Sequence, residues 1–426
     1  FDFEAHLAAL TGPQPHWPES TRAVSELRLS FRLKEAGLLG SVRGPRTLHL
    51  DIVDYPGEWL LDLALLDQDY AAWSAEAVRK AKAPTRAALA KAWLEFAARP
   101  DLRAGDAEQA AIEGARVFTA YLEAAKGAES GVGALTPGRF LMPGDLAGSP
   151  LLTFFPLDLD ADPDARGSAL AQLLEKRFES YKAKVVRPFF RDHFLKLDRQ
   201  IVLVDVLGAL SRGTLSVADL EDALTAVLGA FRPGTNSWLS SLYTRRIDKV
   251  LFAATKADHL SQTSHDRLEA ILMHLTERAA KRVTHAGGEV RGMALSALRA
   301  TREAEVRRGG ETLACISGGP MPGETVGTTV FDGRREAVIF PGDLPADPRE
   351  ALAGSGTTLA GTAATFVRFR PPRLPAPPPG GEAIPAPHIR LDRVLDYLVG
   401  DWLPCPGHCT PRPRASARAG LRFLAL

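Results

Sequence analysis

Short apolar runs, separated by long or helical connections, give the chain its main pattern. Because such connections leave room for crossover helices, the pattern favours a parallel β-sheet over a sandwich of antiparallel strands. We therefore predict the α/β class, with a parallel sheet and crossover helices. The five runs that indicate strands are residues 27–33, 48–53, 201–207, 250–254 and 290–295.

The stretch between the second and third runs has apolar residues at helical spacing instead. We predict a large helical insertion at residues 59–197, inside an α/β domain formed by residues 1–58 and 198–300. Several of its segments begin with Pro, Ser or Asp near the first turn, as helix N-termini do. The segments with helical spacing are residues 59–82, 84–98, 108–126 and 168–192.

The pattern changes again after about residue 300. Residues 301–370 contain many Gly, Thr and Pro and predict a small β-rich segment, and residues 371–387 form an extended, proline-rich connector. Apolar residues at helical spacing then predict one last packed helix at residues 388–403. Residues 404–426 show arginines and prolines without a period, so we expect a disordered tail there.

Composition narrows the classes of function. The formal net charge of +1 gives no field that would attract nucleic acid, which we exclude as a partner. Three scattered cysteines (Cys315, Cys405 and Cys409) argue against a disulfide framework and for a reducing compartment. No apolar run is long enough to span a membrane, and no signal peptide opens the chain. We expect a cytoplasmic protein.

The fourth apolar run is followed by Thr-Lys-Ala-Asp at residues 255–258, which fits the pattern [Thr/Asn]-Lys-x-Asp that is typical of guanine-nucleotide sites. The carboxylate of Asp258 can accept from the ring N1–H and the exocyclic amino group of guanine, whereas adenine presents an acceptor in place of that ring donor. The stem of Lys256 can lie along the base, and Thr255 can tie neighbouring loops together. Ser296 and Ala297 follow the fifth run, where the N–H of Ala297 could reach the guanine carbonyl. The alternative is a strand followed by a polar turn.

A second motif follows the second apolar run. Asp54 and Gly57 fit the pattern D-x-x-G, in which the aspartate holds a water molecule on Mg²⁺ and the glycine N–H contacts the terminal phosphate as a switch. The alternative is an ordinary strand-to-turn sequence. Glu58 stands where many hydrolysing proteins carry a water-orienting glutamine, or else is a solvated residue in the first turn of a helix.

The polar loop of residues 18–22 precedes the first apolar run. Such a loop can supply a hydroxyl to Mg²⁺ and a backbone N–H to the γ-phosphate, and Thr21 is the candidate. Arg22 could stabilise charge on the transferring phosphoryl group, although an arginine beside a loop threonine is most often only solvated. Arg139, between two Pro-Gly turns of the helical insertion, is a weaker candidate for the same role.

One part of a phosphate-binding site is missing from these residues. The 426 residues contain no G-x-x-x-x-G-K-[ST] loop, the backbone cradle for β- and γ-phosphates, and the chain opens without methionine. We therefore expect the chain to begin inside a longer gene product.

Long and unusual strings occur throughout residues 1–402. They are residues 26–29 (ELRL), 52–63 (IVDYPGEWLLDL), 138–140 (GRF), 198–205 (DRQIVLVD), 252–259 (FAATKADH) and 387–392 (PHIRLD). These strings resemble the YcjX family of bacterial P-loop nucleotide hydrolases. The resemblance implies a cytoplasmic GTP-binding, Ras-like domain with a helical insertion and a link to envelope stress.

The chain departs from the family at both ends. Family members carry an N-terminal strand and an S-G-K-T loop ahead of the first residue of this chain, and residues 404–426 look unrelated to the family. In Ras-like sheets that strand lies between the strands expected at residues 48–53 and 201–207, so we expect a gap or a rearrangement there, with unpaired backbone groups. We expect this chain to bind GTP poorly and to hydrolyse it negligibly, whereas the longer parent protein, with the S-G-K-T loop, would bind and hydrolyse GTP.

The resulting hypothesis is a P-loop GTPase that uses GTP or GDP and Mg²⁺. The rival is a nucleotide-gated interaction module of the envelope stress response, in which the helical insertion binds a membrane-associated protein and turnover is small or absent. A third interpretation, an ATPase, is disfavoured by Asp258.

Overall fold

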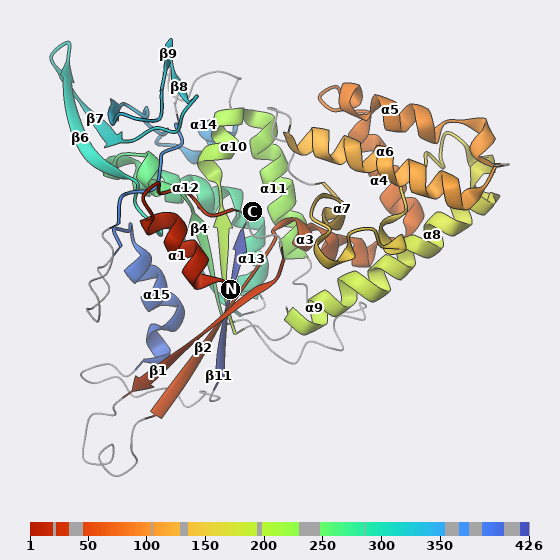
Figure 1. Ribbon diagram of the computed structural model, residues 1–426, viewed down its shortest axis with the longest axis horizontal. Helices are drawn as coiled ribbons and strands as arrows, with labels where there is room; N and C mark the ends of the chain where they lie inside the picture. The colour runs from red at the N-terminus through yellow and green to blue at the C-terminus, as the bar shows by residue number, and fades with distance from the viewer. Residues whose placement is uncertain are drawn as a thin grey trace. The chain divides into compact units, whose positions relative to one another are not determined.

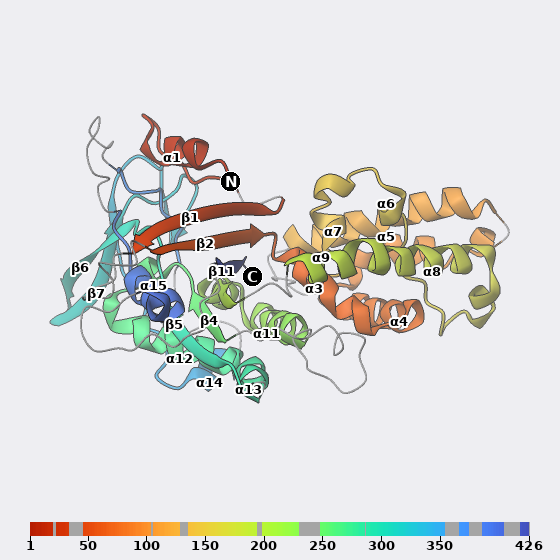
Figure 2. The ribbon, with the colours of Figure 1, turned by 90° about the horizontal axis from the view of Figure 1, so that it is seen from below.

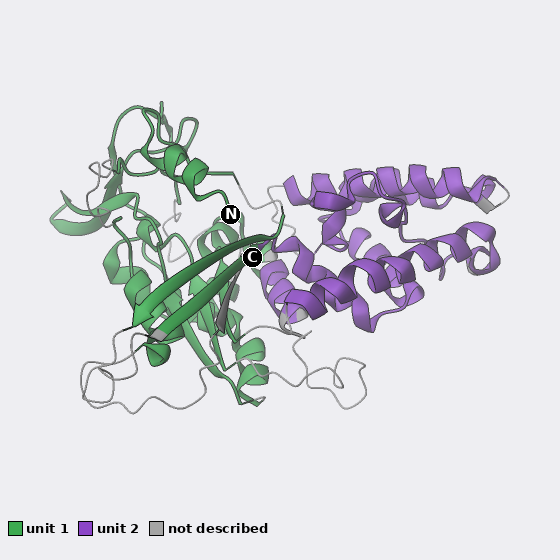
Figure 3. Ribbon diagram, turned by 60° about the horizontal axis from the view of Figure 1, so that its bottom comes forward, with its two compact units in different colours: residues 1–54, 198–217, 247–426 green, residues 55–197, 218–246 purple. Residues whose placement is uncertain are grey.

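The computed structural model describes residues 1–19, 23–33, 46–103, 105–127, 135–193, 198–229, 248–285, 287–353, 366–374, 386–403 and 418–425. The chain divides into two compact units, coloured separately in Figure 3. Unit 1 comprises residues 1–54, 198–217 and 247–426, and unit 2 comprises residues 55–197 and 218–246.

Unit 1 is built on a mixed sheet whose order in the described residues is β1-β2-β11-β3-β4-β5 (Figure 1). β11, β3, β4 and β5 run parallel, and β1 pairs antiparallel with β2, beside which it lies in Figure 2. The predicted α/β class with a parallel sheet is confirmed. The strands are β1 (Ser25–Leu33), β2 (Arg46–Tyr55), β3 (Arg199–Val204), β4 (Lys249–Ala254), β5 (Glu289–Ala294) and β11 (Arg418–Ala425).

Crossover helices join the parallel strands, as expected. The third apolar run was predicted to extend to residue 207, but β3 ends at Val204 because the next residue, Asp205, caps a helix: its Oδ1 accepts from the N–H of Gly208 at 3.0 Å. The helices after β3 are α10 (Val206–Arg212) and α11 (Thr214–Gly229), and those between β4 and β5 are α12 (His265–Leu275) and α13 (Glu277–His285).

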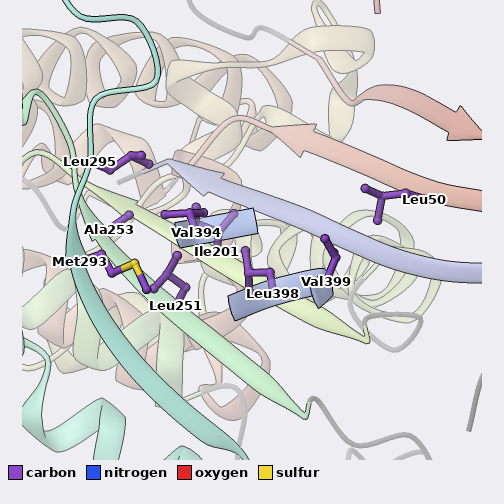
Figure 4. Packing of buried hydrophobic residues seen from close by; sticks show 9 residues of the cluster. All are labelled: Leu50, Ile201, Leu251, Ala253, Met293, Leu295, Val394, Leu398 and Val399. Carbon is purple, nitrogen blue, oxygen red and sulfur yellow. The ribbon is translucent and has the colours of Figure 1, made fainter. Parts of the chain in front are cut away.

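Helices cover both faces of the parallel strands. On one face, α15 (Leu391–Val399) packs its apolar side on residues from β2, β3, β4 and β5 (Figure 4). On the other face lie α12 and α13; an added Cβ at Gly292 of β5 would fall 2.5 Å from the sulfur of Met273, so α12 lies close against the strand. Burial from both sides explains why β3 and β4 are mostly apolar runs, whereas β5, at the edge of the sheet, is exposed at Glu289 and Arg291.

The strand between β2 and β3 comes from the end of the chain. Residues 418–425, in the stretch expected to be a disordered tail, form β11, whose Leu421 is paired in register with Arg199 and whose Ala425 is paired with Leu203. Of the two expected outcomes, the gap is wrong and the rearrangement is confirmed. The expectation of unpaired backbone groups along β3 is wrong as well, because β11 pairs with it. Leu421, Phe423 and Leu424 suit a strand, but nothing in the local pattern of residues 418–425 indicated its neighbours.

The rest of unit 1 consists of smaller elements. β6 (Thr301–Arg308), β7 (Glu311–Gly318) and β10 (Ala337–Ile339) form an antiparallel sheet, and β8 (Thr325–Val326) pairs with β9 (Thr329–Val330). The remaining helical elements are α1 (Phe3–Thr11), η8 (Ala257–His259), η9 (Gln262–Ser264), α14 (Pro348–Ala353) and η10 (Gly400–Trp402).

Unit 2 is helical. The predicted helix at residues 59–82 is interrupted at residues 68–69, because Asp69 caps a new helix by accepting from the N–H of Ala72 at 2.7 Å. The elements are α3 (Glu58–Leu61), η1 (Asp62–Asp67), α4 (Tyr70–Ala81), α5 (Ala87–Ala97), η2 (Pro100–Arg103), α6 (Ala107–Gly127), α7 (Gly138–Leu141), η3 (Gly144–Leu146), η4 (Pro150–Leu152), η5 (Pro163–Gly167), α8 (Ala169–Tyr181), the π-helical η6 (Lys182–Val186) and α9 (Arg187–His193).

Aromatic side chains form much of the core of unit 2. Trp73 stacks on Phe178 with ring centroids 5.0 Å apart and meets Phe154 edge to face at 5.5 Å. Trp93 stacks on Tyr121 at 5.2 Å. Such pairs add about 0.5–1.5 kcal/mol each beyond the area they bury. The helices of this unit are thus held together by their own core.

Candidate nucleotide site

Three loops begin at the same edge of the parallel sheet. Val204, Ala254 and Ala294, the last residues of β3, β4 and β5, are paired with one another in register. The residues that follow them therefore leave the sheet side by side. Ligands of open α/β sheets bind at this carboxyl edge of the strands.

Backbone hydrogen bonds join the three loops. The N–H of Thr255 donates to the carbonyl of Val204 at 3.0 Å, and the N–H of Leu295 donates to the carbonyl of Ala254 at 2.8 Å. The N–H of Ala257 then donates to the carbonyl of Leu295 at 3.1 Å. The loop after β4 is thus fixed between its two neighbours, and the Thr255 hydroxyl adds a 3.3 Å bond to the carbonyl of Val204.

Lys256 lies in the exposed part of this loop. Its backbone is left-handed (φ 60°), which is uncommon for a residue with a side chain, costs energy and persists only where the surroundings enforce it. Its ammonium forms an ion pair with Asp205 at 2.6 Å. Burial would raise the pKa of Asp205, but the charge and hydrogen bond of Lys256 and the N–H of Gly208 hold it below its ordinary value.

Asp258 lies almost fully covered at the end of the same loop, with 3% of its surface exposed. Its Oδ2 accepts from the N–H of Ala300 at 2.8 Å, and its backbone carbonyl accepts from the hydroxyl of Thr301 at 2.5 Å. A carboxylate has about four acceptor positions, so one such bond leaves acceptor capacity for a ligand.

The loop after β5 brings the last two base-side candidates to this edge. Ser296 is buried and exchanges backbone hydrogen bonds of 3.2 and 2.8 Å with Ile389, and its hydroxyl donates to the carbonyl of Leu298 at 3.0 Å. Ala297, the next residue, is exposed. The structure therefore brings Thr255, Lys256, Asp258, Ser296 and Ala297 together at one edge.

Two partners of this site were not assigned from the sequence. Asp205 follows an apolar run just as the loop of Asp258 does, and that signal could have identified it. Ile389, in contrast, is distant in sequence, and its pairing with Ser296 carries no local signal.

The candidates of the second motif fall in different units. Asp54 is half-buried near the end of β2, in unit 1, whereas Gly57 and Glu58 belong to unit 2. Gly57 is buried at the start of α3 with an ordinary helical backbone (φ −60°, ψ −32°). The carboxylate of Glu58 accepts from the ammonium of Lys126 at 2.6 Å. Glu58 is thus paired within unit 2 and is not merely solvated.

The remaining candidates have different positions. Thr21 and Arg22 lie outside the described residues. Arg139 is buried in unit 2, where its guanidinium donates to the carbonyl of Pro143 at 3.2 Å and to Asp145 at 2.9 Å.

Two broader features of the described residues bear on ligands and membranes. No group of three or more His, Cys, Asp or Glu side chains that could hold a metal ion occurs among them. No helix in the described ranges is both long enough and apolar enough to cross a membrane.

Comparison with known proteins places the chain in a family. A family model described as the YcjX-like family, DUF463, matches residues 1–403. The chain belongs to this family. A protein of Shewanella oneidensis named Ras-like GTPase YcjX is 35% identical over 422 residues, which cover 95% of this chain and 81% of the relative. A protein of Escherichia coli K12 with the same name is 36% identical over 414 residues, covering 95% of this chain and 83% of the relative.

Family membership agrees with the architecture. The names of these relatives support a Ras-like P-loop fold, and a parallel sheet with loops at its carboxyl edge is what such a fold requires. The resemblance inferred from strings such as IVDYPGEWLLDL and FAATKADH is confirmed.

Proposed function

We propose that this chain binds guanine nucleotides at the carboxyl edge of β3, β4 and β5. The observation that carries the proposal is the hydrogen bond from Ala257 to Leu295, which holds the loop of Asp258 against the loop of Ala297. Asp258 would accept from the base, the stem of Lys256 would lie along it, and Ala297 would donate to its carbonyl. The names of the two relatives support the same class of ligand.

The nucleotide would bind with Mg²⁺. The carboxylate of Asp54 offers the hard oxygen atoms that Mg²⁺ prefers and would hold a water molecule that is bound to the ion. Thr21 would supply a hydroxyl to Mg²⁺. A bound Mg²⁺ would neutralise charge on the phosphates. Gly57 would contact the terminal phosphate, Glu58 would lie beside the attacking water, and Arg22 would stabilise the transferring group. Together these roles describe hydrolysis of GTP to GDP and phosphate in a protein that also carries the phosphate-binding loop.

We expect these 426 residues to bind the β- and γ-phosphates of GTP only weakly. In the family the strand that carries the phosphate loop is expected between β2 and β3, the place of β11. These 426 residues contain no G-x-x-x-x-G-K-[ST] loop that could take that role. We expect this chain to bind GTP with lower affinity than the relative from Escherichia coli K12 and to show negligible turnover when both are measured under the same conditions. Equal affinity and turnover would contradict this expectation.

The second candidate function is that of an interaction module. In this proposal the chain is a nucleotide-gated module of the envelope stress response, cytoplasmic and bound to a membrane-associated protein. The pairing of Glu58 with Lys126 favours it, because a carboxylate held by a lysine is a poor substitute for a water-orienting amide. Slow turnover that a partner stimulates would support the module, whereas steady phosphate release without a partner would support the enzyme.

Substitution of Asp258 by asparagine tests base recognition. The asparagine carbonyl can still accept from the N–H of Ala300, so the loop keeps that bond while the second acceptor becomes a donor. We expect the affinity for GDP to fall about 10- to 100-fold and the affinity for xanthosine diphosphate, which has an acceptor in place of the amino group, to rise.

The matched control is Asp266→Asn, which changes an exposed carboxylate on α12 that pairs with Arg390. Isothermal titration calorimetry of GDP, ADP and xanthosine diphosphate against both variants measures the effect. Unchanged GDP affinity in Asp258→Asn, or an equal loss in the control, would contradict the proposal.

A further inference from the structure

The helix that follows Gly57 is bonded to other parts of unit 2 at several points. In α3, the indole N–H of Trp59 donates to the carbonyl of Met142 at 2.8 Å, and Glu58 pairs with Lys126 at 2.6 Å. A segment that responds to a ligand needs freedom to move. This segment is instead attached to parts of the chain about 70–80 residues away.

A buried carboxylate lies at the end of α3. Asp62 is 2% exposed and accepts three hydrogen bonds: from the N–H of Gly138 at 2.7 Å, from the N–H of Arg139 at 3.3 Å and from the hydroxyl of Tyr181 at 2.5 Å. We call Asp62, Gly138, Arg139 and Tyr181 the Asp62 cluster. It joins η1, α7 and α8, three elements that are far apart in sequence.

The backbones of α3 and α7 lie unusually close together. A Cβ added to Gly138 would fall 1.9 Å from the carbonyl oxygen of Glu58, so only glycine fits at this point. The guanidinium of Arg139 lies over the ring of Trp59, with its carbon 3.2 Å from the ring centroid. Backbone contact, stacking and the carboxylate thus act on the same short helix.

We infer that Asp62 and Arg139 are positioning residues that hold residues 56–62 in one conformation against α7 and α8. The part of the inference that concerns nucleotides rests on the proposed function, in which Gly57 contacts the terminal phosphate. Gly57 precedes Trp59 by two residues, so its N–H cannot shift far without movement of α3. Any response at Gly57 is then shared with the Asp62 cluster.

The test compares two buried tyrosines of unit 2. Tyr181→Phe removes the hydroxyl that donates to Asp62, whereas Tyr70→Phe removes a hydroxyl that donates to the carbonyl of Phe155 at 2.8 Å, away from the cluster. Both variants lose one buried hydrogen bond, so a merely structural effect would be similar in the two. Arg139→Lys is a second variant, which keeps the charge and removes the planar group from Trp59.

Amide hydrogen exchange without nucleotide decides whether the cluster positions the segment. We expect Tyr181→Phe and Arg139→Lys to speed exchange in peptides that cover residues 56–62 and 137–142 about five- to tenfold, with no such change there in Tyr70→Phe. Equal exchange in these peptides in all three variants would overturn the inference.

A nucleotide arm separates this inference from the proposed function. The affinities for GDP and for a non-hydrolysable GTP analogue are measured in the same proteins. We expect their ratio to change several-fold in Tyr181→Phe and Arg139→Lys and to stay unchanged in Tyr70→Phe; an unchanged ratio in all three would overturn the coupling of the cluster to Gly57. Failure of the unsubstituted chain to bind either nucleotide would overturn the proposed function and the coupling, while the exchange arm still decides the positioning role.

Discussion

At the scale of single residues, Asp62 gives unit 2 a dependence on pH. Burial raises its pKa to about 6, although Tyr181 and the N–H groups of Gly138 and Arg139 act to lower it. An aspartate in an unfolded chain has a pKa of about 3.9. The folded protein therefore binds more protons than the unfolded chain between about pH 4 and pH 6, and the free energy of unfolding falls as the pH rises through that range.

Asp62→Asn removes this titration. We expect the wild-type chain to lose about 2 kcal/mol of stability between about pH 4.5 and pH 7 beyond any loss in the variant, because one pKa unit corresponds to about 1.4 kcal/mol. Tyr181, whose hydroxyl faces Asp62, keeps its proton over this range, because burial and the charge of Asp62 raise its pKa well above its ordinary value. Urea unfolding at the two pH values measures the difference, and parallel pH profiles would contradict it.

The base-side residues could be chosen from the sequence because their chemistry is local. Thr255, Lys256 and Asp258 follow an apolar run directly, so a pattern in one segment indicates both the strand and its polar end. The ion pair between Lys256 and Asp205 could not be predicted in this way. It depends on the register that places the end of β3 beside the end of β4.

At the scale of elements, the contact between α3 and α7 depends on one glycine. Gly138→Ala places a methyl group 1.9 Å from the carbonyl oxygen of Glu58, and because the obstacle is backbone, the helices must separate. We expect a loss of about 2–3 kcal/mol in the free energy of unfolding. Gly167→Ala is the control, since no neighbouring atom lies within 4 Å of its added Cβ. Denaturant unfolding of both variants measures the effect, and equal stability would contradict it.

The turn η10, which follows α15, is held to the sheet by a buried arginine. Arg199, at the start of β3, is 4% exposed; its Nη2 pairs with Asp401 at 2.8 Å, and its guanidinium lies over the ring of Trp402. Its Nε and Nη1 are buried and have no hydrogen-bond partner among the residues that the structure describes. The arginine therefore bears a desolvation cost that Asp401 offsets only in part.

Removal of Asp401 should destabilise the chain more than replacement of Arg199 by methionine. Asp401→Ala leaves the charge of Arg199 buried with a weaker partner, Asp248, at 3.9 Å, and we expect it to destabilise the chain by about 1–3 kcal/mol. Arg199→Met removes the unpaired groups and keeps an apolar stem against Trp402, so its loss should be smaller. Thermal unfolding of the two variants and of the double variant gives the order. A greater loss in Arg199→Met than in Asp401→Ala would contradict this account.

Elements with an even apolar pattern were the easiest to predict. β4 lies at residues 249–254, one residue longer than the predicted run of 250–254. The run could be recognised because strands buried on both faces have no polar interruptions. The helix expected at residues 59–82 shows the limit of periodicity. Its apolar spacing continues through residues 68–69, where the carboxylate of Asp69 ends one element and begins another.

At the scale of the whole molecule, sequence predicted the class of the sheet and not its full order. Three strands connected by helices follow from the pattern, since parallel neighbours need a crossover. The place of β11 does not, because it pairs with β3 across more than 200 residues of chain. Non-local pairing of this kind is set by which unpaired backbone groups are available in the folded sheet and not by the local sequence.

Deletion of residues 404–426 tests how far the sheet depends on β11. The deletion removes the strand between β2 and β3 and, with it, five register pairs with β3. At about 1 kcal/mol for each pair, we expect the melting temperature to fall by about 10 °C. It also exposes two strand edges, so we expect aggregation in size-exclusion chromatography. The control is deletion of residues 1–12, which removes α1, a helix without buried residues. If both truncated chains unfolded at the same temperature and stayed equally monodisperse, β11 would contribute no measurable stability to the sheet.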